Sequence, residues 1–261
     1  MDIQGYFAET GGGAKYVSIA PSRLVGTNTG IGLPLAKIVG GSTQTVQIAG
    51  LAGIPVDATA VFANVRVLNA NVHGGVRIGA SDQDLSSAPY AINYAANEYT
   101  DTGMTIKLGP DGKAKVSSPT PTSSLDLLVD VQGYFHNGSG ERFNTLGNAQ
   151  IFDTHSSSPL AAGEARQVTA AGKAGVPTGP SVEAVAVTIT ATQWGNSGTI
   201  SVYSSDGIAN GTSNLAVKSP NTSPKSSTSI VELGMKQEAS QSRTTPRVRY
   251  IWPLVHRAGL G

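Results

Sequence analysis

An internal repeat is the feature of this sequence that most constrains its fold. The string DIQGYF at 2–7 returns as DVQGYF at 130–135, and four further landmarks recur behind each copy in the same order. These landmark pairs are Pro34-Leu35-Ala36 with Pro159-Leu160-Ala161, Ala52–Pro55 with Ala174–Pro177, Ser81-Asp82 with Ser205-Asp206, and Leu108-Gly109 with Leu233-Gly234. Their offsets drift between 122 and 128 residues, as expected when a duplicated fold changes its loop lengths. The sequence therefore predicts two modules of about equal size.

The local pattern inside each copy is typical of β-strands. Apolar residues alternate with other residues from Val61 to Leu68, and the second copy repeats this alternation over 184–190. A period of two with many β-branched residues indicates half-buried strands. Further runs of this kind are Thr45–Ile48, Val76–Ile78, Thr105–Leu108, Leu125–Val131, Thr199–Tyr203 and Ser229–Leu233. We predict an all-β protein of two tandem β-sandwich or jelly-roll-like modules, with a hairpin turn at Pro110-Asp111-Gly112.

Glycine-rich stretches define the expected domain boundaries. We predict an orphan closing strand and Gly-rich linker over 1–15, a first module over 16–136, a linker over 137–143 and a second module over 144–261. The string at 130–135 closes the first module, whereas its copy at 2–7 has no module before it in this sequence. We expect this copy to be an assembly strand that pairs with an exposed strand edge of a neighbouring chain and gives a homo-oligomer. The assembly strand consists of Asp2, Ile3, Gln4, Gly5, Tyr6 and Phe7.

Three of these motifs resemble the DVQGYF-type tandem β-repeat modules of secreted and cell-surface proteins of actinobacteria. They are the G-I-P turn within Ala52–Pro55, the K-L-G string Lys107–Gly109 and the closing string Val129–Phe135. The first copy resembles these modules over about 16–135, whereas the second, eroded copy departs from them after Gly234. The resemblance implies a non-catalytic role in surface attachment or display, and it implies no catalytic residues.

Composition excludes several other classes of protein. A formal net charge of +1 gives no attraction to nucleic acid, and no apolar run approaches the roughly 20 residues that membrane insertion needs. The absence of cysteine excludes disulfides, thiolate zinc sites and a cysteine nucleophile. Charged residues make up 13% of the chain, about half the usual share of ~25%, so hydroxyls and amides keep it in solution. Such a surface is typical of secreted β proteins and of virion proteins.

No group of residues has the spacing of a known active site. The histidines follow strands or lie in turns and tails, at His73, His136, His155 and His256, and there is no G-x-S-x-G elbow. Asp82 and Asp84 are weak metal candidates because they lack the spacing of a calcium loop. Asp126 and Asp130 share one face of a strand, where an outward orientation would leave them solvated. We predict no enzyme activity, no metal and no cofactor.

Aromatic side chains are the remaining candidates for binding. Tyr94 is expected in the core, and Tyr90 with it because both have the same parity, whereas Tyr99 and Trp194 have no such requirement. We predict Trp194, Tyr99 and the loop residue His73 as binding residues, because exposed rings stack on sugars and anchor interfaces.

The sequence is therefore compatible with three functions. The first is an extracellular, cell-surface attachment module that binds polysaccharide or protein through loops. The second is a virion structural protein of a phage, a capsid decoration or tail protein that assembles by strand exchange. The third is an accessory domain of a larger secreted hydrolase.

Overall fold

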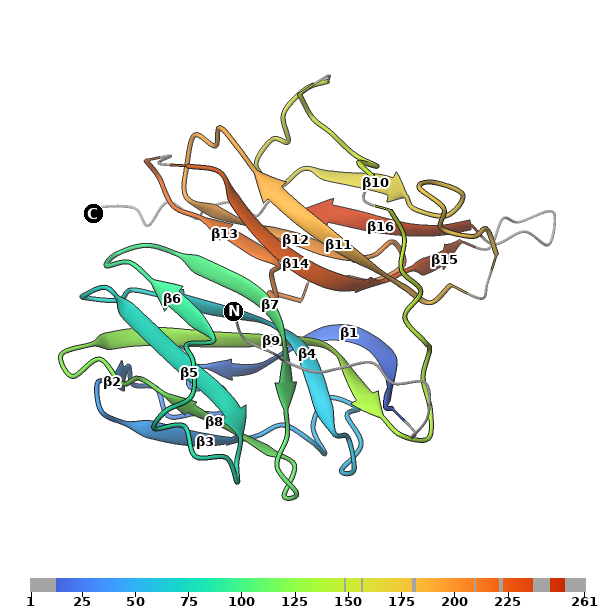
Figure 1. The fold of residues 1–261 in the computed structure, drawn as a ribbon. Helices are drawn as coiled ribbons and strands as arrows, with labels where there is room; N and C mark the ends of the chain where they lie inside the picture. The colour runs from blue at the N-terminus through green and yellow to red at the C-terminus, as the bar shows by residue number, and fades with distance from the viewer. Residues whose placement is uncertain are drawn as a thin grey trace.

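The chain folds into antiparallel sheets and contains no helix in the part that the structure describes (Figure 1). The computed structural model describes residues 13–147, 149–155, 157–179, 182–208, 210–220, 223–236 and 245–251, the last two residues of the sixth range and all of the seventh by their backbone alone. The all-β prediction is confirmed. The expected assembly strand Asp2–Phe7 lies outside the described residues.

The first half of the chain forms two packed sheets. Its strands are β1 (Lys15–Gly26), β2 (Ile38–Val39), β3 (Thr43–Gln47), β4 (Ala60–Leu68), β5 (Gly74–Ala80), β6 (Ile92–Tyr94), β7 (Thr100–Lys107), β8 (Lys113–Ser117) and β9 (Ser124–His136). One sheet has the order β1-β9-β4-β7 with β2 beside β9, and the other has the order β3-β8-β5-β6. One hydrophobic cluster joins the two sheets, and it contains Val61 and Val65 of β4, Val131 of β9 and Val116 of β8. This arrangement is a β-sandwich.

The second half also forms two antiparallel sheets. Its strands are β10 (Ala165–Thr169), β11 (Ala184–Ala191), β12 (Gly198–Ser204), β13 (Leu215–Val217), β14 (Lys225–Glu232), β15 (Gly234–Lys236) and β16 (Thr245–Ile251). One sheet has the order β10-β16-β12-β13 with β15 beside β16, and the other consists of β11 and β14. A second hydrophobic cluster forms here around Val202, Leu215, Val217 and Val231.

The pair β4–β7 and the pair β11–β14 have matching registers. In the first, Ala60 lies opposite Lys107 and Val67 opposite Thr100. In the second, Ala184 lies opposite Glu232 and Ala191 opposite Lys225. Even the hydrogen bond that closes each ladder recurs, from Leu108 N to Thr59 O at 3.0 Å and from Leu233 N to Glu183 O at 2.8 Å.

The two halves meet where strand edges of the second half rest on the outer face of the first sheet. Three backbone N–H groups of the second half donate to side chains of the first: Ile230 N to Gln132 Oε1 (2.9 Å), Ala216 N to Asp101 Oδ2 (2.9 Å) and Ser213 N to Asp130 Oδ2 (3.0 Å). These side chains satisfy edge groups that would otherwise be buried without partners. The interface is therefore polar and specific.

Asp101 is the most buried charge of this interface. Its carboxylate accepts hydrogen bonds from Arg66 Nε at 2.7 Å and from Asn64 Nδ2 at 2.9 Å, and both members of the Arg66–Asp101 ion pair are buried. Burial raises the pKa of Asp101, and the positive charge of Arg66 opposes that rise. The pair consequently depends on the second half for its shielding from water.

Three expectations differ from the structure. Pro110-Asp111-Gly112 does not turn a hairpin, because β7 pairs with β4 in one sheet while β8 pairs with β3 and β5 in the other. Asp126 and Asp130 are buried instead of solvated, since Thr27 and Asn69 donate to Asp126, and Arg23 forms an ion pair with Asp130. Tyr90 is 43% exposed and lies under the guanidinium of Arg77, whereas Tyr94 is in the core as predicted.

Candidate functional site: the open edge of β11

β11 pairs with β14 along one edge and, among the described residues, with no strand along the other. Ile230 lies opposite Ala186 and directs its N–H away from β11, to Gln132. Opposite residues in an antiparallel ladder alternate between bonded and non-bonded pairs. Ala186 therefore directs its own N–H and C=O away from β14, and so do Ala184, Thr188 and Thr190. This row of backbone groups is the open edge of β11.

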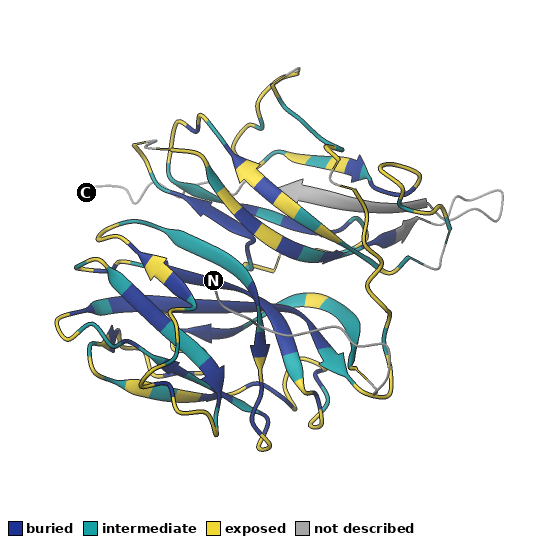
Figure 2. Ribbon diagram, viewed as in Figure 1, coloured by how far each residue is buried: buried dark blue, intermediate teal, exposed yellow. Residues whose placement is uncertain are grey.

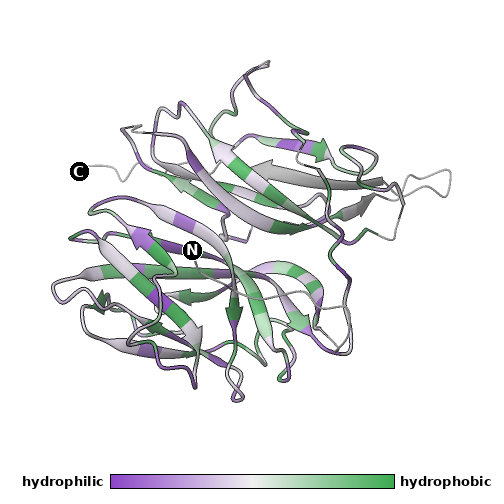
Figure 3. Ribbon diagram, viewed as in Figure 1, coloured by the Kyte–Doolittle hydropathy of each residue, from purple (hydrophilic) through white to green (hydrophobic). Residues whose placement is uncertain are grey.

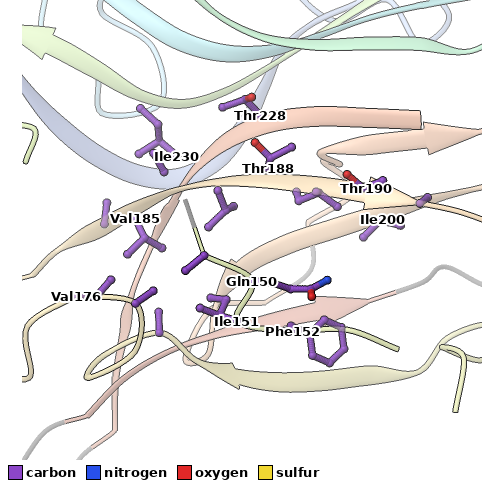
Figure 4. Close-up of a pocket in the computed structure, with 18 of the residues that line it drawn as sticks. Gln150, Ile151, Phe152, Val176, Val185, Thr188, Thr190, Ile200, Thr228 and Ile230 are labelled. Carbon is purple, nitrogen blue, oxygen red and sulfur yellow. The ribbon is translucent and has the colours of Figure 1, made fainter. Parts of the chain in front are cut away.

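The open edge lies in a large groove. The groove has a volume of about 2360 Å³ and follows β11 over 182–192. Figure 4 shows Thr188 and Thr190 on one side of it, with Gln150, Ile151 and Phe152 of the segment after β9 on another. Most of the labelled residues are aliphatic or carry a hydroxyl, so this part of the groove is largely apolar, while Glu141, Arg142, Asp153 and Glu183 also line the groove.

Burial along β11 reflects this groove. Ala186, Thr188 and Thr190 are exposed, and Val185 and Val187 on the opposite face are only half-buried although they pack against the second hydrophobic cluster (Figure 2). Figure 3 shows hydrophobic residues alternating with more polar ones along the same strand. Apolar residues on the core face of a strand are normally covered by a neighbour on each side. The core face of β11 has space for a further neighbour.

Tyr16 marks one end of the groove. This end is the Ala184 end of β11, where Glu232 lies opposite Ala184. Burial raises the pKa of Tyr16, and the negative charge of Glu232 adds to the rise. Burial also raises the pKa of Glu232, with further contributions from Asp206 and Glu183. The Tyr16 hydroxyl is buried without a hydrogen-bond partner in the described part of the chain.

The three predicted binding residues do not meet at one place. Trp194 is 9% exposed, packs in the second hydrophobic cluster and donates its indole N–H to Lys218 O at 3.0 Å. Tyr99 is half-buried beneath the ammonium of Lys218, and His73 is exposed before β5. Trp194 also lines the groove, so it is the one of the three that belongs to this site.

Asp84, one of the two weak metal candidates, and the histidines His136 and His155 have local structural partners. Asp84 accepts the N–H and hydroxyl of Ser86, both at 2.8 Å, and these bonds lower its pKa, while Asp82 is exposed beside it. His136 bonds Asp57 at 3.1 Å and His155 bonds Asp153 at 2.8 Å. Within the described ranges no three His, Asp or Glu side chains gather as a metal site would require, and no helix is long and apolar enough to cross a membrane.

Sequence reasoning missed the groove because no single residue marks it. The signal that could have found it is the position of the closing string: one copy, at 130–135, follows the alternating strand Val61–Leu68, whereas no copy follows the alternating strand at 184–190 in the printed sequence. Comparison of the chain with protein-family models gives no match, and neither does comparison with curated protein sequences.

Proposed function

We propose that this protein is a non-catalytic structural or attachment protein that holds an extended protein segment along β11. The observation that carries the proposal is the open edge, where the N–H and C=O groups of Ala184, Ala186, Thr188 and Thr190 pair with no strand in the described part of the chain and face a largely apolar groove. An extended peptide that adds to a sheet edge gains main-chain hydrogen bonds, and pockets for alternate side chains give specificity. The groove offers both kinds of contact.

The composition of the groove favours protein over polysaccharide as the partner. Sugar rings need aromatic faces that are free to stack. The indole of Trp194 is packed into the core and its N–H is used, so it offers little free face. Binding of polysaccharide through Tyr99 or His73 remains a prediction that is separate from the groove.

We infer further that the chain consists of two tandem sandwich modules, 16–136 and 144–261. Three observations support this inference: the repeated landmarks, the common orders β3-β8-β5-β6 and β10-β16-β12-β13, and the matching registers of β4–β7 and β11–β14. In this scheme β11 is the counterpart of β4.

The setting that we propose is extracellular, at a cell surface, with a virion as the alternative. Both settings suit a surface rich in hydroxyls and amides and poor in charge. Both also use strand addition to join chains. An accessory domain of a larger secreted hydrolase shares these features.

A peptide-binding experiment tests the proposed function. The probe is a fluorescent peptide with the sequence of Val129–Phe135, and the protein is a chain shortened to begin at Gly13, which keeps every described contact. We expect saturable binding that perturbs the amide signals of Ala186, Thr188 and Thr190. Thr188→Pro removes one edge-directed N–H and should abolish binding, whereas the matched control Thr188→Ala keeps that N–H and should bind. Failure of the peptide to bind, or equal binding by both variants, would overturn the proposal.

A further inference from the structure

β4 of the first half, which has the same register with β7 as β11 has with β14, shows which strand is expected beside β11. β4 lies between β7 and β9, and β9 in turn lies between β4 and β1. The part of β9 next to the start of β4 is the string at 130–135, which pairs from Ala60–Phe135 to Asn64–Asp130. The sequence holds a second copy of this string, at 2–7.

The registers define how this copy would lie against β11. The β9–β4 ladder has a bulge between Phe62 and Ala63, so that Tyr134 lies opposite Val61 and Val131 opposite Ala63. Transferred to β11, Tyr6 lies opposite Val185 and Ile3 opposite Val187. In β9 the two corresponding side chains, Tyr134 and Val131, are buried in the first hydrophobic cluster. Tyr6 and Ile3 would therefore cover Val185 and Val187, which are only half-buried.

The segment after β9, which lines the groove opposite β11, corresponds to β1 at the offset of the sequence repeat. Among the described strands β1 pairs with β9 only. A segment that corresponds to β1 in the second half would therefore need a strand between itself and β11 in order to pair in the same way. The segment that follows β9 lines the groove with Phe143, Leu146 and Ile151, and the structure assigns no strand to the residues that it describes there. The groove therefore lies between β11 and the segment that corresponds in the sequence to β1.

The length and direction of the chain point to the segment of the same molecule. In the transferred register Phe7 reaches Ala184, the end of β11 near Tyr16, and β1 begins at Lys15. Seven residues lie between Phe7 and Lys15, and the eight Cα–Cα steps that connect them span at most about 26–29 Å. Tyr16, the second residue of β1, is affected by the charge of Glu232, which lies opposite Ala184, so the start of β1 lies near the Ala184 end of β11. A short, Gly-rich connection raises the effective concentration of a tethered strand to the millimolar range.

We propose that Asp2–Phe7 inserts into the groove of its own chain as a strand antiparallel to β11, and closes the second module. This inference rests on the proposed function, because it names the segment that the open edge holds when no partner is present. A partner strand then has to displace this one. The tail after β16 and a second copy of the chain are the competing occupants.

A disulfide test uses the full chain, which has no cysteine of its own. Ile3 and Val187 form a non-bonded pair in the transferred register, with Cα atoms about 4.5 Å apart, a distance that a disulfide can bridge. We expect Ile3→Cys with Val187→Cys to form an intramolecular disulfide, seen by mass spectrometry as a cross-linked monomer. Ile3→Cys with Ala186→Cys is the matched control, since a shift of one residue places the two thiols on opposite faces and should slow the reaction at least about tenfold. A disulfide-linked dimer would overturn the assignment to the same chain, and no disulfide or equal rates would overturn the insertion itself.

A second measurement separates this inference from the proposed function without relying on cysteine variants. The peptide Val129–Phe135 should bind the chain that begins at Gly13 at least about tenfold more tightly than it binds the full chain, because the tethered strand competes. Full-length Ile3→Asp/Tyr6→Asp should recover the tight binding, and full-length Gln4→Asp, at the position of the bulge, should not. Equal binding to the full and shortened chains would overturn the inference and leave the proposed function standing. No binding to either chain would overturn both.

Discussion

β4 and β11 have matching registers with their neighbours but very different surroundings. β4 has a strand on each side and the second half of the chain on its outer face, and all its residues from Val61 to Val67 are buried. Among the described strands β11 has one neighbour, β14, and its outer residues Ala186, Thr188 and Thr190 are exposed (Figure 2). The difference shows that burial here is decided by which strands and which half of the chain lie alongside, and only secondarily by the alternation of apolar residues within the strand.

The largest loss of stability is expected at the buried ion pair between Arg66 of β4 and Asp101. Asp101→Ala leaves the guanidinium of Arg66 buried without its partner, and we expect a loss of about 3–5 kcal/mol in the free energy of unfolding. Chemical denaturation measures this loss. The half-exposed ion pair between Lys225 and Glu98 is the control, and Glu98→Gln should cost less than about 1 kcal/mol. Similar costs for the two variants would contradict the buried interface.

The next effect tests how closely the two halves approach. A Cβ at Gly103 would lie 1.8 Å from Thr228 O, a backbone atom, so Gly103→Ala should force the halves apart. We expect a loss of about 1–3 kcal/mol and a larger radius of gyration in X-ray scattering. Gly195→Ala is the control, because nothing lies within 4 Å of that position. An unchanged radius in Gly103→Ala would show that the halves do not dock in this way.

A smaller effect compares matched positions of the two strands directly. Asn64 of β4 bonds Ser213 O, Asp101 and Ser227, whereas Thr188 of β11 is exposed at the corresponding place. Asn64→Ala should cost about 1–3 kcal/mol of stability, since it leaves buried groups without partners. Thr188→Ala should lie within about 0.5 kcal/mol of the parent. Equal costs, measured by thermal unfolding, would remove the distinction between the two strands.

The smallest effect depends on pH at the Ala184 end of the groove. The pKa of Glu232 is raised above its ordinary 4.5, first by burial and then by Asp206 and Glu183, so its stabilising contribution is present below that value and is lost as the pH rises through the raised pKa. Glu232→Gln should therefore be more stable than the parent at pH 7–8, by less than about 1 kcal/mol because the side chain is half-exposed. The difference should vanish at pH 4. A variant less stable than the parent at neutral pH would indicate an ion pair instead.

Much of the fold follows from the sequence, and the reasons are visible in particular residues. Alternation from Val61 to Leu68 predicted β4, and its copy predicted β11, because a period of two is set within one strand. Periodicity does not specify partners, which is why Pro110-Asp111-Gly112 was expected to turn a hairpin although it joins two sheets.

Less of the candidate site than of the fold could be predicted from the sequence. The burial of Asp130 comes from Ser213 and its neighbours in the other half, which no local pattern records. The open edge of β11 likewise depends on which strands pair with β11, and the sequence of β11 itself does not specify them. The repeated string at 2–7 and 130–135 was the one sequence signal that pointed toward it.

Amide hydrogen exchange of the chain that begins at Gly13 tests the central claim most directly. The amides of Phe62, Asn64 and Arg66 in β4 should be protected, because β9 covers that edge. The amides of Ala186, Thr188 and Thr190 should exchange freely and become protected when the peptide Val129–Phe135 is added. Strong protection of these three β11 amides without peptide would contradict an open edge, and with it the account of this protein as a strand acceptor.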